Sequence, residues 1–496
     1  MHSDPIDTVL LIHGYSEQSL DAYGGFPTAL MQAATAAGKP LDTVILSAFD
    51  SLDDGVTIDD LAAGLEKQVS RLEDGAKRPW DTSQVVVISH STGALAARRW
   101  LLNRAAKGQQ LPSHFITMAG ANHGSTLAQV GRTPLGQAHQ YLYKAGRTAG
   151  ARVLTDLDFG SDFLLRLNCE WLKARAVPDS PMSKVCYFSM GGDQLGPDQS
   201  TRLLWASREN GCDNTVRISA ANLNYNYLEG NVETGILEPL PTTPVPHLII
   251  AGYSHYGPQN GIMAGAQTPA APQIQAIIEA LNIAYPATSD GPYGALATEW
   301  AARNTAWAGA PAVNDRGDPR STVPGMTNAD IHANSTIVFN VKDRVGNAID
   351  DCFIALFDAN APMLDADDDG DKNIAIAAVL RLGGAIESRW PIHNTVQRGS
   401  YAFYVNTKRF YAAAGGGADP LHHQVTITAA VPGDCVTFDP VSYQTDPAVV
   451  HLVQANQTTY VDIVMHRSTD ATYAIYDHSR QGMPAPAWRP FPDNAL

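Results

Sequence analysis

The chain of 496 residues is longer than one ordinary domain, so we expect two or three domains. Its net charge of −16 argues against nucleic-acid binding, which requires a basic face. Apolar runs such as 85–89 are far shorter than the roughly 20 residues that cross a bilayer, so no transmembrane segment is expected. Residues 1–14 lack the features of a signal peptide. We therefore expect a cytoplasmic protein, with secretion after removal of a leader as the alternative.

The first 285 residues alternate short apolar strands with helical stretches, a pattern typical of a parallel sheet covered by helices on both faces. The clearest strand, 84–89, is continuous in Val and Ile, as expected for a buried parallel strand. A helix is expected after Thr57, because Asp60 can complete a capping box with it. Further strands are expected at 8–14, 42–48, 114–118, 184–189 and 247–251, and a further helix at 93–104. We assign residues 1–285 to one α/β domain.

Residues 126–182 form an insertion that is too long for a simple crossover between two strands. Ser161 can cap a helix on which Phe163, Leu167 and Trp171 share one face. We interpret the insertion as a cap or lid over a substrate pocket that these three apolar side chains line. The alternative is an additional helix packed on the core.

The composition changes after residue 285. Residues 286–333 are rich in Ala, Pro, Gly and Asn and are interpreted as a connecting segment with one helix at 293–306. Between 334 and 470, apolar and polar residues alternate in short runs, which predicts an antiparallel β-sandwich. Residues 471–496 are expected to form a tail. The predicted fold class is α/β, with a mostly parallel sheet and helices on both faces, followed by a C-terminal all-β sandwich-like domain.

Ser91 lies where the most apolar strand runs directly into a helix. The surrounding residues, Ser89-His90-Ser91-Thr92-Gly93, place small side chains on either side of it. This strand–turn–helix setting is typical of a nucleophile elbow, in which a sharp turn exposes a serine hydroxyl. The pentapeptide departs from G-x-S-x-G only in that Ser89 replaces the first glycine. The sequence therefore predicts that Ser91 is a nucleophile.

Five segments together resemble bacterial triacylglycerol lipases and related carboxylesterases of the α/β-hydrolase superfamily. They are LIHGYS (11–16), VVVISHSTGALAAR (85–98), ITMAGANHGSTLA (116–128), GCDNTVRISAANLN (211–224) and GYSHYGPQNGIM (252–263). The resemblance covers roughly residues 1–265 and implies an α/β-hydrolase fold and hydrolysis of carboxylic esters. The β region further along the chain lies outside it.

In that fold the loop after the first strong strand places a backbone N–H opposite the one that follows the nucleophile. Here the loop is His13-Gly14-Tyr15-Ser16. The resemblance therefore implies that the backbone N–H groups of Tyr15 and Thr92 form an oxyanion hole. His13 and His90 flank the elbow and are interpreted as supporting groups.

The general base is expected after a late strand, and His255 follows the apolar run LIIAG. Two acids are candidates. Asp213 matches the acid loop of the resembled family, whereas Asp193 lies at the end of a strand, where other α/β-hydrolases carry their acid. We favour Asp213 because its loop matches the acid loop of the resembled family, and the order Ser91, Asp213, His255 agrees with the chain order of this fold.

These residues predict a serine-dependent ester hydrolase that acts through an acyl-enzyme, with a small-molecule or lipid ester as substrate and transient contact with a lipid surface. A lipase for acylglycerol-type esters is the preferred interpretation. The alternatives are an esterase, phospholipase or polyester depolymerase of the same fold, or a hydrolase-fold binding protein with a silent site. No cofactor is expected.

Acidic residues at 365–369 begin like a calcium loop, with oxygen ligands at alternate positions. The twelfth position is Ile376, where an EF-hand needs glutamate. A solvated acidic turn is the preferred interpretation, and a structural calcium ion held by Asp365, Asp367 and Asp369 is the alternative.

The five cysteines lack metal-binding spacing, so a metal site is not expected from them. They are expected to be reduced. A bridge between Cys352 and Cys435 is the alternative.

Overall fold

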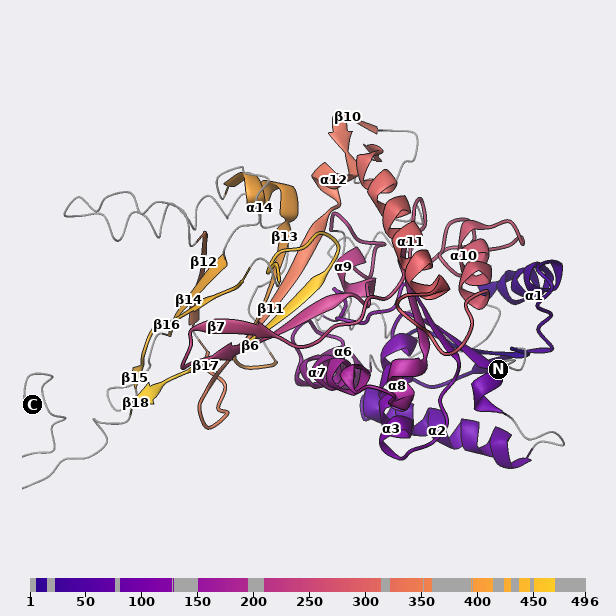
Figure 1. Ribbon diagram of the computed structural model, residues 1–496, viewed down its shortest axis with the longest axis horizontal. Helices are drawn as coiled ribbons and strands as arrows, with labels where there is room; N and C mark the ends of the chain where they lie inside the picture. The colour runs from indigo at the N-terminus through magenta and orange to yellow at the C-terminus, as the bar shows by residue number, and fades with distance from the viewer. Residues whose placement is uncertain are drawn as a thin grey trace, which may run out of the picture.

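The computed structural model describes residues 6–15, 23–75, 81–126, 128, 150–194, 209–313, 322–350, 352–358, 394, 396–413, 423–429, 437–446 and 450–468. Two large sheets organise this part of the chain. In Figure 1 the first sheet and its helices lie to the right, and the second sheet extends to the left.

The first sheet has six parallel strands in the order β2-β1-β3-β4-β5-β8. Its strands are β1 (Thr8–Ile12), β2 (Thr43–Ser47), β3 (Val85–His90), β4 (His114–Met118), β5 (Cys186–Gly192) and β8 (His247–Ile250). This arrangement confirms the parallel sheet predicted for the first part of the chain. Because all six strands point the same way, the loops that follow them meet at one edge of the sheet.

Helices cover both faces of this sheet (Figure 1). Along β3, Val85 and Val87 belong to one hydrophobic cluster, and Val86 and Ile88 belong to another on the opposite face. The first face carries α2 (Ile58–Gly75), α3 (Gly93–Ala106), α6 (Ala151–Asp156), α7 (Asp162–Ala176) and α8 (Pro181–Lys184). The second face carries α1 (Phe26–Ala36), α10 (Pro272–Leu281) and α11 (Pro292–Gly309).

Two predicted helix starts are confirmed by their caps. The Asp60 amide donates to Thr57 Oγ1 over 3.2 Å, and Asp60 Oδ2 accepts the Thr57 amide over 2.9 Å, so α2 begins with a capping box. Ser161 Oγ accepts the Leu164 amide over 3.2 Å at the start of α7.

The second sheet has eight strands in the order β12-β14-β16-β7-β6-β17-β11-β13, with parallel and antiparallel pairs. Its strands are β6 (Tyr225–Asn231), β7 (Ile236–Pro239), β11 (Asn334–Asp343), β12 (Cys352–Asp358), β13 (Ser400–Asn406), β14 (His423–Ala429), β16 (Val441–Gln444) and β17 (Thr458–Met465). Short elements complete the described chain: η2 (Thr82–Gln84), α9 (Ile218–Ala221), β9 (Pro311–Val313), β10 (Thr322–Thr327), α12 (Asn328–Ile331), α14 (Thr407–Ala413), β15 (Thr437–Phe438) and β18 (Arg467–Ser468).

The β domain expected from residue 334 onward is present, and its form differs from the predicted sandwich of residues 334–470 in two respects. The strands form one continuous mixed sheet, and this sheet takes β6 and β7 from the part of the chain assigned to the α/β domain. β6 pairs in parallel with β17, with Tyr227 opposite Tyr460. Alternation of apolar residues predicts a strand but does not reveal its partner, so the sequence could not show that β6 pairs with β17.

The two sheets also share a core. Val338 and Tyr460 of the eight-stranded sheet belong to the same buried cluster as Leu164 and Trp171 of α7. The predicted connecting segment is likewise part of the core, because Tyr293, Leu296 and Trp300 of α11 are buried against the six-stranded sheet. Their i, i+3, i+7 spacing gives α11 one inward face within an otherwise Ala-rich segment.

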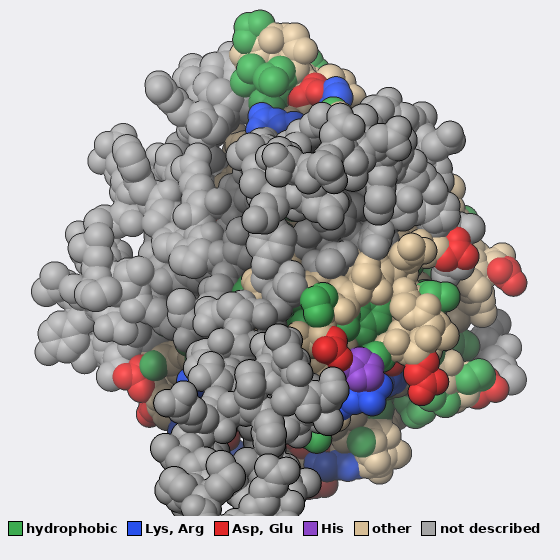
Figure 2. Space-filling view, turned by 90° about the vertical axis from the view of Figure 1, so that its left-hand side faces the viewer, with side chains coloured by type: hydrophobic (Ala, Val, Ile, Leu, Met, Phe, Trp, Pro, Cys, Tyr) green, Lys and Arg blue, Asp and Glu red, His purple; other side chains and the backbone are tan. Residues whose placement is uncertain are grey.

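Within the described residues, no helix is both long and apolar enough to cross a membrane. On the side of the molecule that Figure 2 shows, the described acidic, basic and apolar side chains are intermixed and not gathered by kind. The tail 471–496, Cys435 and the candidate calcium ligands Asp365, Asp367 and Asp369 lie outside the described residues.

Candidate active site

Ser91 occupies a sharp turn between β3 and α3. Its φ of +54° is rare for a residue other than glycine, and it turns the side chain out of the line of the strand. Backbone hydrogen bonds hold the turn: the Ser91 amide donates to Met118 O over 3.2 Å, and Ser91 O accepts the amides of Ala94 and Ala121, each over 3.1 Å. This is the geometry of a nucleophile elbow.

The small residues around Ser91 are required by close packing. A Cβ on Gly93 would lie 2.2 Å from His13 O, and a Cβ on Gly14 would lie 2.8 Å from Ser91 Cβ. Both distances are too short for real atoms. The loop after β1 therefore lies directly against the elbow, as the resemblance implied.

Three side chains that are far apart in the sequence form one hydrogen-bonded chain. His255 Nε2 lies 2.9 Å from Ser91 Oγ, and His255 Nδ1 lies 2.8 Å from Asp213 Oδ2. All three side chains are buried. A carboxylate accepts the Nδ1 proton, so Nε2 carries the lone pair that faces the serine hydroxyl. The arrangement fits a serine nucleophile, a histidine base and an acid that orients the base.

The loop around Asp213 fixes its carboxylate. Oδ1 accepts the amides of Thr215 and Val216 over 3.0 and 2.7 Å, which leaves Oδ2 for the imidazole. The His255 amide donates to the Asp213 backbone oxygen over 2.8 Å. Acid and base are thus joined through both backbone and side chain.

Asp193, the alternative acid, is directed elsewhere. Its Oδ1 accepts the Gly252 amide and its Oδ2 accepts the Trp307 indole, each over 2.7 Å. Burial raises the pKa of its carboxyl. Asp193 therefore joins α11 to the segment that follows β8, and the structure brings Asp213, not Asp193, to the imidazole.

His13 supports the loop that lies against Ser91. Its Nε2 accepts the Phe49 amide over 2.8 Å, so its proton is on Nδ1, which donates to Gly14 O over 2.6 Å. The imidazole stacks on the Phe49 ring with centroids 3.9 Å apart, and burial lowers its pKa. A neutral His13 thereby fixes the backbone just before Tyr15.

His90 lies beside the catalytic candidate His255, with ring centroids 4.9 Å apart. Burial, followed by the nearby His255, lowers the pKa of His90 well below its usual range. A neutral His90 adds no positive charge when His255 takes a proton. The supporting role of His90 stays a prediction.

The pocket-lining role expected for α7 does not agree with the packing. Trp171 is fully buried against Phe115 of β4 and Tyr187 of β5, and the Arg98 guanidinium lies 4.6 Å from its ring centroid. Leu167 is buried in the same cluster. The described part of the insertion thus includes a helix packed on the core, the alternative interpretation. An i, i+4, i+8 apolar stripe is the same for a lid and for a core helix, so the pattern could not separate the two.

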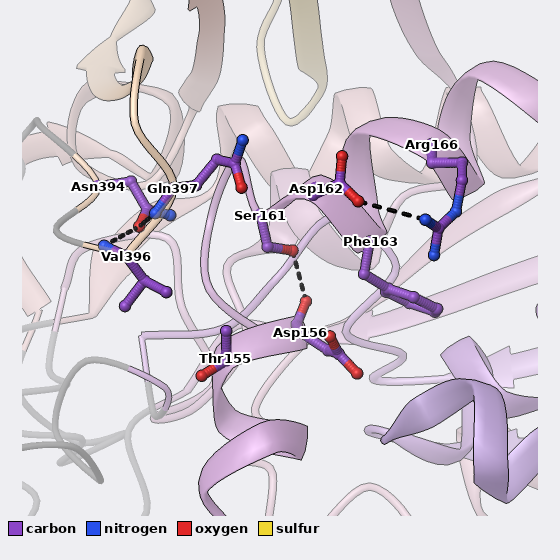
Figure 3. Close-up of a pocket in the computed structure, with 9 residues that line it drawn as sticks. All are labelled: Thr155, Asp156, Ser161, Asp162, Phe163, Arg166, Asn394, Val396 and Gln397. Carbon is purple, nitrogen blue, oxygen red and sulfur yellow. Dashed lines mark hydrogen bonds and ion pairs between the residues drawn. The ribbon is translucent and has the colours of Figure 1, made fainter. Parts of the chain in front are cut away.

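Phe163 belongs to the same buried cluster and in addition faces a cavity. It lines a cavity of about 110 Å³ between α6, the start of α7 and the segment before β13 (Figure 3). The other lining residues are Thr155, Asp156, Ser161, Asp162, Arg166, Asn394, Val396 and Gln397. Ser91, Asp213 and His255 do not line it, so this cavity is not the site where an ester would meet the nucleophile.

Sequence reasoning missed the residues that anchor the acid loop. Glu209 and Arg217 form a buried ion pair, with Arg217 Nε 2.7 Å from Glu209 Oε2. The only sequence signal is their opposite charge at equal spacing on either side of Asp213. In the described part of the chain, no group of three or more His, Cys, Asp or Glu side chains is placed to hold a metal ion.

The parallel sheet with its helices, the elbow at the end of β3 and the histidine after the last strand define the α/β-hydrolase fold, which this chain has together with an additional β domain. Two solved structures of phospholipase PlaB from Legionella pneumophila, one in complex with thio-NAD, share this whole architecture. They align with TM-scores of 0.71 and 0.72 at 24% and 23% identity, covering 97% of this chain and 97% and 98% of theirs.

A second similar structure is a shorter enzyme. Lipase BlEst2 of Bacillus licheniformis aligns at 16% identity over 57% of this chain and 95% of its own, with a TM-score of 0.37. No protein-family model and no curated protein matches the sequence. The likeness to PlaB extends through the eight-stranded sheet, so the α/β and β parts form one shared architecture.

Proposed function

We propose that this protein is a serine hydrolase that cleaves carboxylic esters through an acyl-enzyme. The observation that carries the proposal is the hydrogen-bonded chain from Ser91 Oγ through the His255 imidazole to the Asp213 carboxylate. Few other functions require a strained, buried serine whose hydroxyl faces the basic nitrogen of a carboxylate-paired histidine.

In the proposed reaction, Ser91 Oγ attacks the ester carbonyl while His255 Nε2 takes its proton. The imidazolium then donates that proton to the leaving alkoxide as the ester C–O bond breaks. Water, deprotonated by His255, hydrolyses the acyl-enzyme and restores Ser91. Asp213 holds the imidazole in the required tautomer throughout and stabilises its protonated form.

The negative charge on the carbonyl oxygen needs hydrogen-bond donors. We assign this role to the backbone N–H groups of Tyr15 and Thr92. Gly14 packs against Ser91 Cβ, which brings the next amide, that of Tyr15, to the border of the nucleophile, and Thr92 precedes the first turn of α3. The N-terminus of a helix favours negative charge. Loss of one such donor costs about 10² to 10³ in kcat in comparable sites.

For the substrate we propose phospholipid esters. The likeness to a protein named as a phospholipase spans nearly the full length of both chains, and it favours phospholipids over the acylglycerols expected from the sequence motifs. Contact with a lipid surface belongs to the same proposal.

The test measures release of fatty acid from phosphatidylcholine vesicles, phosphatidylglycerol vesicles and a triacylglycerol emulsion, with p-nitrophenyl butyrate as a soluble reference. We expect turnover of the reference ester and faster release from phospholipid than from triacylglycerol, with both lost in Ser91→Ala. Hydrolysis confined to triacylglycerol would show that the protein acts as a lipase and not as a phospholipase. A chain that turns over none of these esters would overturn the proposed reaction.

A further inference from the structure

The loop that carries Asp213 is closed at its base by a buried ion pair. Arg217 donates from Nε and a terminal nitrogen to both carboxylate oxygens of Glu209, over 2.7 and 3.0 Å. Residues 212 and 217 form an isolated antiparallel bridge, and the Ile218 amide donates to Gly211 O over 2.8 Å. With the two amide bonds to Asp213 Oδ1, the loop has a fixed internal shape. Its position relative to His255 then depends on the bond from the His255 amide to Asp213 O and on contacts with the rest of the fold.

Ser125 Oγ, from the segment after β4, donates to Thr215 O over 2.6 Å, and further contacts come from the eight-stranded sheet and the segment that enters it. The hydroxyl of Tyr404, on β13, donates to the backbone oxygens of Asn210 and Gly211, over 3.2 Å in the second case. Asn334 Nδ2, at the start of β11, donates to Asn210 O over 2.9 Å. The Gly211 amide donates to His332 Nδ1 over 3.0 Å. Three side chains thus hold two consecutive peptide groups just before Asp213.

Tyr404 also contacts the ion pair at the base of the loop. The Arg217 guanidinium lies 4.0 Å from the Tyr404 ring centroid and 4.2 Å from the Phe159 ring centroid. Tyr404 is fully buried, so both its ring and its hydroxyl are committed to the loop. Gly211 completes the fit: its φ is +67°, and a Cβ there would lie 2.4 Å from His332 O and 2.8 Å from the Tyr404 hydroxyl.

We propose that Tyr404, with Asn334 and His332, positions the catalytic acid, so that docking of the eight-stranded sheet completes the active site. This inference rests on the proposed function. The acid must remain within hydrogen-bond reach of His255 Nδ1, and a displacement of about 1 Å costs roughly 10² in rate. These side chains touch neither substrate nor reacting atoms and act only through the position of Asp213.

The test is Tyr404→Phe, which removes the hydroxyl and keeps the ring over Arg217. We expect kcat for p-nitrophenyl butyrate to fall about 10- to 100-fold, with KM changed less than about twofold. Tyr460→Phe is the matched control. Tyr460 is also fully buried in the second sheet, and its hydroxyl accepts a hydrogen bond from Asn168 over 2.9 Å without contacting the acid loop. We expect it to leave kcat within about twofold of wild type.

A double-mutant cycle separates positioning from general support. In an Asp213→Asn background the acid is already lost, so adding Tyr404→Phe should lower the rate of Ser91 labelling by a fluorophosphonate by less than about twofold. If Tyr404→Phe lowered the rate of Ser91 labelling by the same factor in the wild-type and Asp213→Asn backgrounds, Tyr404 would not act through Asp213. Tyr404→Phe with unchanged kcat would also overturn the inference.

A second variant acts from the opposite side of the contact. Gly211→Ala should wedge the loop away from the sheet and lower kcat more than Tyr404→Phe does, and wild-type kcat in a folded Gly211→Ala would contradict the inference. If Gly211→Ala does not fold, the Tyr404→Phe cycle still decides. Failure of the proposed function has a different signature, because wild-type protein would then neither hydrolyse the ester nor be labelled at Ser91.

Discussion

The indole Nε1 of Trp307 lies 2.7 Å from Oδ2 of Asp193 and donates a hydrogen bond to it. This bond joins the last turns of α11 to the carboxyl end of β5. The other carboxylate oxygen, Asp193 Oδ1, accepts a hydrogen bond from the Gly252 amide beyond β8. A strand-end carboxylate that looked like an alternative catalytic acid therefore holds the scaffold. Asp213 reaches the imidazole from a separate loop.

The two carboxylates should respond differently to the same substitution. Asp213→Asn is expected to lower kcat by about 10⁴, because the amide cannot hold the imidazole in the tautomer that accepts the serine proton. Asp193→Asn is expected to lower kcat by less than about tenfold and to act mainly through stability. Steady-state kinetics on both purified variants check this. Collapse of activity in Asp193→Asn with a mild loss in Asp213→Asn would reverse the assignment.

His13→Ala should lower kcat by roughly 10- to 100-fold with little change in KM, because the loop before Tyr15 loses the imidazole that links Gly14 O to the Phe49 amide. Phe49→Leu is the matched control, since it removes the stacked ring but keeps the backbone amide that His13 binds. Kinetics with p-nitrophenyl butyrate provide the measurement. An effect of His13→Ala on KM alone would mean that the loop binds substrate and does not stabilise the oxyanion.

Trp171→Ala should behave as a core substitution. We expect it to lower the free energy of unfolding by about 3 to 5 kcal/mol and to change kcat/KM equally for C4 and C16 esters. Lys173 lies on the exposed side of α7, so Lys173→Ala should leave both the free energy of unfolding and kcat/KM nearly unchanged. Urea denaturation and a two-substrate comparison suffice. A selective loss on the C16 ester would restore the lid interpretation.

The stability of the fold should fall on mild acidification. Burial lowers the pKa of several histidines: His13, His90, His114, His123 and His247. For His114 the folded pKa is about 4 against 6.5 when unfolded, so its contribution is complete above pH 6.5 and is lost as the pH falls toward 4. At pH 5 this group alone costs about 2 kcal/mol.

Urea midpoints at pH 7.5 and pH 5 measure this loss. His114→Gln should show a smaller difference between the two midpoints than wild type, because the glutamine does not titrate. Equal midpoints at both pH values in the wild type would contradict the expected acid sensitivity.

The alternation of apolar strands and helical stretches predicted the parallel sheet. Ser91 and His255 could be selected as candidates because each follows a strongly apolar strand. The sequence also favoured Asp213, through the resemblance of the loop. The second sheet was not predictable in the same way. Tyr227 and Tyr460 face each other across β6 and β17 only after the chain has folded, and alternation in either segment says nothing about that pairing.

The same limit explains why the sequence did not reveal the acid-loop anchors or the place of β6 and β7 in the second sheet. In the sequence, Tyr404 is only an aromatic residue within an expected strand. Its contact with Gly211 arises only in the folded chain. Removal of residues from 334 onward would leave β6 without β17 and the acid loop without Tyr404. Single substitutions are therefore the sharper tests.

The central claim is that Ser91 is the nucleophile of an ester hydrolase. Its most direct test is to treat the protein with a fluorophosphonate, map the modified peptide by mass spectrometry and follow p-nitrophenyl butyrate turnover in the same sample. We predict modification at Ser91 alone, loss of turnover in step with labelling, and neither labelling nor turnover in a folded Ser91→Ala variant. Modification at another serine, or turnover that persists in Ser91→Ala at wild-type rates, would contradict the claim.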